Sequence, residues 1–203
     1  MSKHVYISAD YDKSGGDQEV VNELNDWGQD KKHKVDFIDM AKVASGTVAN
    51  AIDCRICDLK EEFNRQINAS SAVIFVVGNM TMYRTAGDSC ERAGGNNWIY
   101  YCTPYKGNSN GKKLCRRAAT FANTYASDVD CINNYSYLKH EFMQAVKKNK
   151  DIIILYNSMR KEMSWLPDYM TGYESKAVPF WTYNSLGAKV GNYSLIKKFL
   201  GFE

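Results

Sequence analysis

Two of the six cysteines, Cys54 and Cys57, are separated by only two residues. A C-x-x-C pair can form half of a zinc site or a redox motif. A four-ligand zinc site needs a second pair, whereas the remaining cysteines are scattered singly, at positions 90, 102, 115 and 131. The pair also does not follow the first predicted strand, where a thioredoxin-like site would lie. We therefore interpret both cysteines as small apolar residues on adjacent turns of a helix, and we predict no metal site.

The glycines and histidines form no recognised catalytic pattern. Neither a Walker A motif nor a G-x-G-x-x-G follows the first predicted strand, which argues against a P-loop or a Rossmann dinucleotide site. The histidines fit structural, surface or helix positions, so none is placed for a hydrolase triad. Asp10 follows the first strand, as the acceptor of a phospho-receiver does. That site also needs an acidic partner and a later lysine, whereas the third strand ends at Gly78-Asn79.

Five short runs rich in β-branched and aromatic residues predict strands, and helical patterns separate most of them. The strands are predicted over 3–8, 34–39, 71–77, 151–156 and 177–183, and the helices over 17–28, 52–68, 135–149 and 193–200. The third run is apolar on both faces, which is typical of a central parallel strand. This alternation predicts a doubly wound, flavodoxin-like α/β fold with a five-stranded parallel sheet.

In such sheets, ligands bind at the carboxyl ends of the strands, near the switch point. Four segments are expected to meet there: the loop after Ser8, the loop after Asp39, Gly78-Asn79, and the start of the helix that carries Glu141. This topology locates a site without naming its chemistry.

Residues 78–130 interrupt the regular alternation. They are polar and rich in Gly, Asn, Tyr and Cys, and only Lys113 to Tyr125 has a helical pattern. A connection this long is usually functional or an elaboration of a core. We interpret it as an insertion between strand three and the following helix, within a single domain spanning 1–203. It either supplies a lid or acceptor pocket, or covers the sheet edge, through Tyr83, Trp98, Tyr100, Tyr101 and Tyr105.

Composition excludes several other classes. The net charge of +3 is too small to indicate a nucleic-acid partner, and the longest basic cluster is the short stretch 31–34. The N-terminus lacks the apolar region of a signal peptide, and the longest apolar run, Ala72 to Val77, is too short to cross a bilayer. We expect a cytoplasmic protein with reduced cysteines and no membrane partner.

Three segments taken together resemble the TIR and TIR-like domain family: the strand Ser71 to Val77, the stretch Tyr135 to Ala145, and the strand that starts at Lys150. In that family, a strand ending in a polar turn precedes a helix with an aromatic residue, a Glu four positions later, and then an Ala. Tyr137 takes the aromatic place and Glu141 the acidic one. The N-terminal segments also resemble those of the family in their order: the first strand with its loop, the second strand, the BB-like loop to residue 50, and the 52–68 helix. The resemblance covers most of the chain except 78–130.

The resemblance implies a TIR-type enzyme that cleaves NAD+ as its substrate and needs no cofactor. Glu141 would hold the hydroxyls of the nicotinamide ribose, where a fixed anion stabilises the oxocarbenium-like ribose that forms as the glycosidic bond breaks. Ala9 and Asp10 would lie beside that ribose or its phosphate, unless their loop is a capping turn. Further substrate contacts are expected from Asn79, from Asp39, which alternatively caps its loop, and from Tyr137, which alternatively packs one turn before Glu141.

A stand-alone TIR-like chain resembles the TIR subunit of bacterial Thoeris anti-phage systems. This implies a nucleotide second messenger that activates a separate effector protein. Attack from within the molecule gives a cyclic ADP-ribose isomer, and an outside nucleophile such as histidine gives a conjugate. The alternatives are a non-catalytic TIR adaptor that acts through protein contacts, including TIR–TIR contacts between copies, and a receiver or nucleotide-sensing domain.

Overall fold

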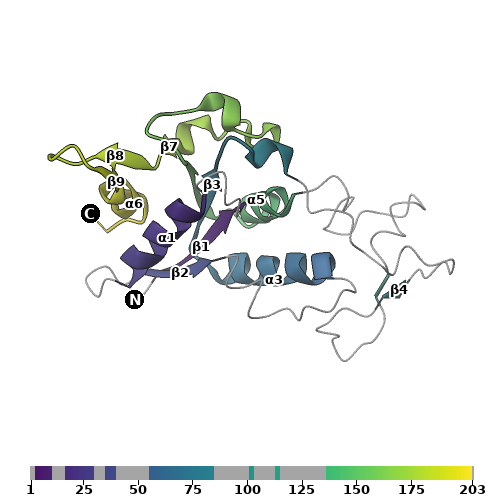
Figure 1. Ribbon diagram of the computed structural model, residues 1–203. Coiled ribbons are helices and arrows are strands. Elements are labelled where there is room, and N and C mark those ends of the chain that lie inside the picture. The colour runs from purple at the N-terminus through teal and green to yellow at the C-terminus, as the bar shows by residue number, and fades with distance from the viewer. Residues whose placement is uncertain are drawn as a thin grey trace.

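A five-stranded parallel sheet forms the centre of the molecule, with strand order β2-β1-β3-β6-β7 (Figure 1). The computed structural model describes residues 3–10, 17–29, 35–39, 55–84, 101–102, 113–114 and 136–202. The sheet consists of β1 (Lys3–Ala9), β2 (Val35–Asp39), β3 (Ala72–Val77), β6 (Asp151–Tyr156) and β7 (Ala177–Pro179), and every neighbouring pair is parallel. The predicted α/β class and the five-stranded parallel sheet are therefore confirmed.

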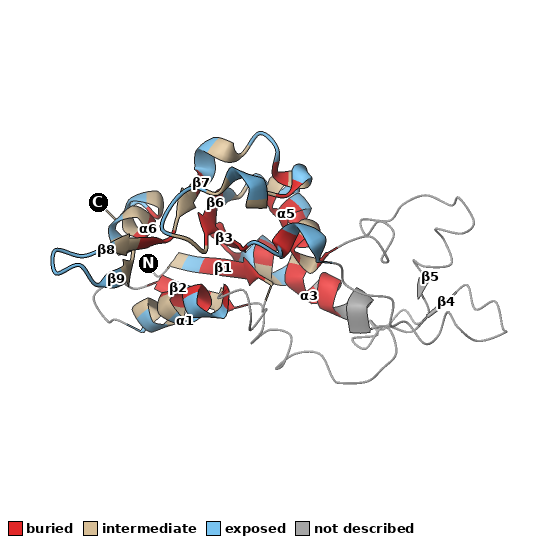
Figure 2. Cartoon of the chain, turned by 45° about the horizontal axis from the view of Figure 1, so that its top comes forward, coloured by how far each residue is buried: buried red, intermediate tan, exposed pale blue. Residues whose placement is uncertain are grey.

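Helices cover both faces of this sheet (Figure 1). α1 (Asp17–Gly28) and α6 (Tyr193–Phe199) pack on one face, and α3 (Arg55–Ala69) and α5 (Tyr137–Lys147) pack on the other. Each face has its own apolar core, and every residue of β3 is buried between them (Figure 2). This arrangement explains why the sequence of β3 is apolar throughout, because a strand buried on both sides has no polar face.

β1 distributes its side chains between the two cores. Successive side chains of a strand point to opposite faces, and Val5, Ile7 and Ala9 accordingly lie in the core beneath α1 and α6. Tyr6 lies in the opposite core, beneath α3 and α5, and Ser8 follows on the same side. Between Val5 and Ala9, the α3–α5 side of β1 therefore carries two hydroxyl groups, whereas the other side carries only apolar groups.

α5 begins at a capped N-terminus that sets its register. The Ser136 hydroxyl accepts a hydrogen bond from the Lys139 amide at 2.9 Å, as an N-cap side chain does. Leu138, Phe142 and Ala145 form a buried stripe along the helix. This register places the Glu141 side chain in the interface between α5 and the sheet.

The predicted strand over 177–183 is wrong in one respect. β7 ends at Pro179, and Trp181–Tyr183 forms a separate strand, β8, which pairs antiparallel with β9 (Lys189–Gly191). Proline has no amide hydrogen to donate, so it is poorly placed to continue a ladder. The Phe180 amide then donates to the Tyr156 carbonyl at 2.9 Å, after which the chain leaves the sheet.

The helix predicted over 113–125 does not begin at Lys113. Lys113–Leu114 forms the short strand β5, which pairs antiparallel with β4 (Tyr101–Cys102). Pairing with a distant segment overrides a weak local helical preference. The other residues of that prediction lie outside the described part of the chain, as does most of the proposed insertion.

Short 3-10 helices make up much of the remaining described chain: η1 (Thr81–Tyr83), η4 (Met163–Trp165), η5 (Asp168–Met170) and η6 (Glu174–Lys176).

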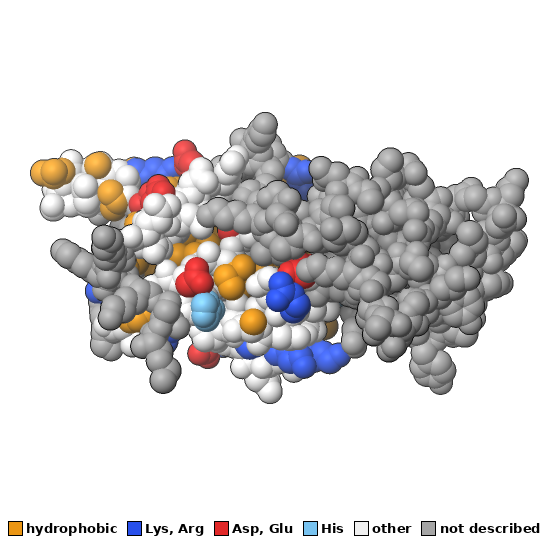
Figure 3. Space-filling model, turned by 90° about the horizontal axis from the view of Figure 1, so that it is seen from below, with side chains coloured by type: hydrophobic (Ala, Val, Ile, Leu, Met, Phe, Trp, Pro, Cys, Tyr) orange, Lys and Arg blue, Asp and Glu red, His pale blue; other side chains and the backbone are white. Residues whose placement is uncertain are grey.

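On the face drawn in Figure 3, the described part shows acidic, basic and histidine side chains close together. Within the described ranges, none of the helices combines the length and apolar character needed to cross a membrane.

Candidate active site

Glu141 has the most unusual environment among the predicted site residues. It extends from α5 toward β1, and its side chain is 0% exposed. Neither carboxylate oxygen makes a hydrogen bond of normal geometry to a described residue. Burial raises the pKa of Glu141 to about 8, while the Ser8 and Tyr6 hydroxyls and, more weakly, the Lys60 charge act to lower it. A carboxyl with this burial and so few partners is characteristic of a functional site rather than of a packed core.

The hydroxyls of Tyr6 and Ser8 face Glu141 from β1. Both residues are fully buried, and neither hydroxyl has a hydrogen-bond partner of normal geometry in the described part of the structure. Burial raises the pKa of Tyr6 well above its ordinary value, and the charge of Glu141 raises it further. Two hydroxyls and a carboxyl thus share one buried polar region, where a ligand that carries hydroxyl groups can complete their hydrogen bonds.

Asp10 adds a second carboxyl just beyond the end of β1. It is half-buried, and its Oδ2 atom is buried without a hydrogen-bond partner among the described residues. Burial raises the pKa of Asp10 to about 6, against the lowering effect of the nearby Arg84. Its charge in turn raises the pKa of Glu141. The two carboxyls predicted to meet at this edge of the sheet therefore interact.

Asp17, the first residue of α1, is a third carboxyl at this edge. Its Oδ1 accepts a hydrogen bond from the Asn157 side-chain amide at 3.1 Å, and the Trp181 indole donates to Asn157 at 2.9 Å. Burial raises the pKa of Asp17 to about 7, the Asn157 hydrogen bond lowers it, and the charge of Asp10 raises it. The Asp17 carboxyl thus contacts Asn157, in the segment after β6, from the first turn of α1.

Lys60 brings a positive charge to the same region from α3. It is fully buried, and its ammonium nitrogen lies 5.9 Å from the centroid of the Tyr137 ring, within the range of a cation–π contact. Its carbonyl oxygen lies 3.2 Å from His140 Nε2, which ties α3 to α5 next to Glu141. A buried lysine needs compensating negative charge or polar contacts, and its charge lowers the pKa of Glu141.

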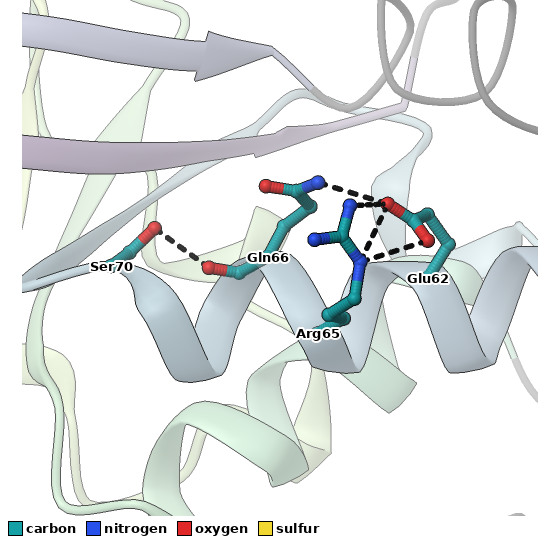
Figure 4. Close-up of polar contacts among 4 residues, drawn as sticks. All are labelled: Glu62, Arg65, Gln66 and Ser70. Atoms are coloured by element: carbon teal, nitrogen blue, oxygen red, sulfur yellow. Dashed lines mark hydrogen bonds and ion pairs between the residues drawn. The ribbon is translucent and has the colours of Figure 1, made fainter.

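Glu62 offers a direct comparison with Glu141, because both carboxylates are buried. Glu62 is held on α3 by the Arg65 guanidinium and by the Gln66 amide, which donates at 2.9 Å (Figure 4). Its oxygens are thus occupied by side chains of the same helix. Glu141 has no such bonded partners in the described residues. The two buried glutamates therefore differ in whether their oxygens are available to accept hydrogen bonds from a ligand.

Two of the other predicted site residues lie beside α3 and α1. The Tyr137 ring is half-buried and packs edge-on against Phe63, with 5.6 Å between centroids and an interplanar angle of 89°. The Asp39 carboxylate accepts a hydrogen bond from the Asn25 amide of α1 at 3.2 Å. Both side chains therefore have structural contacts of their own.

Ala9 and Asn79 do not share the buried surroundings of Glu141. The Ala9 side chain lies in the core beneath α1 and α6, on the opposite face of the sheet. Asn79 is exposed in the turn after β3, next to Gly78, whose amide donates to the Thr81 hydroxyl at 2.9 Å. The structure thus brings Asp10 and Glu141 together and places the Ala9 side chain elsewhere.

The sequence prediction missed Tyr6, Ser8, Lys60 and Asn157. One signal was available: Tyr6, Ser8 and Asp10 alternate with apolar residues along β1, which marks one face of an otherwise buried strand as polar. No comparable signal identifies Lys60, because a lysine in a helix is ordinarily solvated.

The cysteine pair cannot be placed, since Cys54 and the Cys57 side chain lie outside the described residues. Within the described part of the chain, no three His, Cys, Asp or Glu side chains are grouped in a way that could hold a metal ion.

Comparison of the sequence with protein-family models gives no match, and comparison with curated proteins gives none either.

Proposed function

We propose that the chain is a cytoplasmic, TIR-type enzyme that cleaves NAD+, releases nicotinamide and makes an ADP-ribose-derived signal. The observation that carries this proposal is the fully buried Glu141 carboxyl, which makes no hydrogen bond of normal geometry to a described residue. It is accompanied by the hydroxyls of Tyr6 and Ser8 and by Asp10, near the carboxyl end of β1. Ligands of parallel α/β sheets bind at this edge.

The diol of the nicotinamide ribose fits the hydrogen-bonding needs of Glu141. Two ribose hydroxyls can donate to its two oxygens, and hydrogen bonds to the charged form of a carboxyl lower its pKa. The group that is largely protonated in the free protein at pH 7 thereby becomes an anion when the substrate is bound. NAD+ also carries a positive pyridinium next to this ribose, which favours the same ionised state.

Cleavage then uses the anion where charge develops. The bond between the ribose C1′ and the nicotinamide nitrogen breaks, and its electron pair neutralises the pyridinium. The ribose becomes oxocarbenium-like, and a fixed carboxylate in a buried site stabilises this charge more than the neutral ground state. One preorganised group of this kind contributes about 3 kcal/mol to the transition state.

The resemblance to stand-alone TIR subunits supports a signalling role for the product. The signal, a cyclic ADP-ribose isomer or a histidine-type conjugate, would activate a separate anti-phage effector, and copies of the chain would associate through TIR–TIR contacts. The alternative, a non-catalytic TIR adaptor, has no use for Glu141 in this setting, because burying a carboxyl without hydrogen bonds costs folding free energy.

The test measures nicotinamide release from NAD+ by chromatography. It compares the purified protein with extracts of phage-infected cells that express it, so that a protein that is silent at rest is also assayed after infection. Glu141→Gln keeps the shape of the side chain and removes its charge. Glu19→Gln makes the same chemical change on the exposed face of α1, where Glu19 pairs with Lys189.

We expect Glu19→Gln to match the wild type and Glu141→Gln to be about 100-fold slower. Circular dichroism checks that both variants fold. Equal nicotinamide release by the wild type and Glu141→Gln in the activated extract would contradict the catalytic role. Mass spectrometry of the product distinguishes a cyclic from a conjugated signal.

A further inference from the structure

Asp10 and Glu141 interact at the edge of the sheet but differ in how far their carboxyls are exposed to solvent. Glu141 is fully buried, whereas Asp10 is half-buried, with Oδ2 enclosed and lacking a hydrogen-bond partner among the described residues. They come from different elements, the end of β1 and the middle of α5. Their exposure thus distinguishes an inner carboxyl, Glu141, from an outer one, Asp10.

We propose that Asp10 is the general base of the reaction, which accepts the proton of the nucleophile that attacks the ribose carbon. This inference rests on the proposed NAD+ cleavage, and it assigns the second carboxylate a role separate from that of Glu141. Glycoside-cleaving sites commonly divide work in this way, with one carboxylate stabilising the sugar cation and the other activating the attacking group.

The step balances as a substitution at C1′. The C1′–nitrogen bond breaks, and its electron pair stays on nicotinamide. A lone pair of the nucleophile, an O–H or N–H group, forms the new bond to C1′. The proton of that group passes to the Asp10 carboxylate, which becomes a carboxylic acid and later returns the proton to water. No oxidant or reductant takes part.

Charged and titratable groups surround Asp10 from every described element near it: Glu141 from α5, Asp17 from α1, Tyr169 from η5, and Arg84 just after η1. Burial raises the pKa of Asp10 to about 6, and Arg84 keeps it from rising further. Asp10 is thus mostly ionised at pH 7, yet it is a stronger base than an ordinary aspartate. This is the range in which a general base is most effective.

The experiment measures kcat/KM for nicotinamide release between pH 5 and 9 in the activated preparation. It compares the wild type with Asp10→Asn and with Asp36→Asn, a matched change at an exposed residue paired with His4. We expect Asp10→Asn to be about 100-fold slower at pH 7, and Asp36→Asn to match the wild type. Sodium azide, an anion that needs no deprotonation, should restore nicotinamide release to Asp10→Asn but not to Glu141→Gln.

The pH profile gives a second readout. Below pH 6 the wild type must ionise both carboxyls, so log kcat/KM should rise with a slope of about two, and Asp10→Asn should reduce this slope to about one. In Asp10→Asn, the part of the kcat/KM profile that reports the ionisation of Glu141 should also move to lower pH, because the Asp10 charge no longer raises the pKa of Glu141. Asp10→Glu keeps a carboxylate and should retain the steeper slope, even if Asp10→Asn folds poorly.

The outcomes separate the two proposals. If the wild type is active and depends on Glu141, but Asp10→Asn has the same rate and slope as the wild type, the general-base inference is overturned and NAD+ cleavage stands. A slope of one in Asp10→Glu also overturns it. If the activated wild type releases no nicotinamide, the proposed function itself fails.

Discussion

The Asp17 carboxylate occupies the space that a side chain at residue 78 would need. A Cβ atom on Gly78 would lie 2.5 Å from Asp17 Oδ1, the same oxygen that accepts the Asn157 hydrogen bond. The Asn157 backbone N–H also donates to the Val77 carbonyl at 3.0 Å. The missing side chain at 78 therefore lets α1, β3 and the segment after β6 meet next to Asp10.

Gly78→Ala tests this close approach. The new methyl group must displace the Asp17 carboxylate from Asn157, so we expect a loss of about 1–2 kcal/mol in the free energy of unfolding, measured in urea. In an Asp17→Ala background the methyl group meets no carboxylate, and the same substitution should cost clearly less. An equal loss in both backgrounds would show that the contact does not constrain residue 78.

Glu141→Gln should change how stability depends on pH. Burial raises the pKa of Glu141 from 4.5 to about 8, so between these values the native state binds more protons than the unfolded state. Stability contributed by this group is therefore lost as pH rises through that window. Asp10 and Asp17 act in the same direction, because burial also raises their pKa values.

Because glutamine cannot ionise, Glu141→Gln should be more stable than the wild type at pH 8, by a few kcal/mol at most, and show no such gain at pH 5. Urea unfolding at several pH values measures the difference, with Glu19→Gln as the exposed control. Parallel stability curves for wild type and Glu141→Gln would mean that the Glu141 carboxyl does not titrate differently in the folded protein.

The sequence predicted the framework well where burial leaves a simple pattern. The bounds of β6, and those of β3 to within one residue, follow from short apolar runs, and the parallel pairing follows from the helices between the strands. The split between β7 and β8 was missed, although Pro179 marks it. A run of apolar and aromatic residues looks continuous until pairing with a second partner, here Lys189–Gly191, is known.

The site was predicted only in part, for a related reason. Position in the chain and family resemblance pointed to Glu141 and Asp10, but neither shows which polar side chains are buried around them. Lys60 lies beside Leu59 on a helix whose polar residues are normally solvated, and only the packing of α3 against α5 reveals that it is enclosed. Burial of a polar side chain depends on a partner element, which local periodicity does not contain.

Tyr137 provides a test of packing against substrate stacking. Its ring lies edge-on to Phe63 and near the Lys60 ammonium group, so we expect its main contribution to be structural. Tyr137→Ala should lower the free energy of unfolding by about 1–3 kcal/mol, whereas Tyr137→Phe should change it by less than about 0.5 kcal/mol. A tenfold higher KM for NAD+ in Tyr137→Ala, without loss of stability, would instead favour stacking on the nucleotide.

Lys60→Met should shift the pH dependence of kcat/KM near pH 8 to higher pH. The Lys60 charge lowers the pKa of Glu141, so its removal raises that pKa above its present value of about 8. The free protein must then lose a proton at higher pH before it binds NAD+ productively, and the limb of kcat/KM near pH 8 should shift upward. Activity at pH 7 should fall accordingly.

Two controls isolate the charge of Lys60 from its packing. Lys60→Arg keeps a cation at this position, and Lys189→Met removes an exposed one that pairs with Glu19. We expect Lys60→Arg and Lys189→Met to keep the pH dependence of kcat/KM seen in the wild type, whereas Lys60→Met alone shifts it. A limb that stays in place or moves to lower pH in Lys60→Met would mean that the ionisation seen in the kinetics does not belong to Glu141, because the loss of a neighbouring cation can only make a carboxylate harder to ionise.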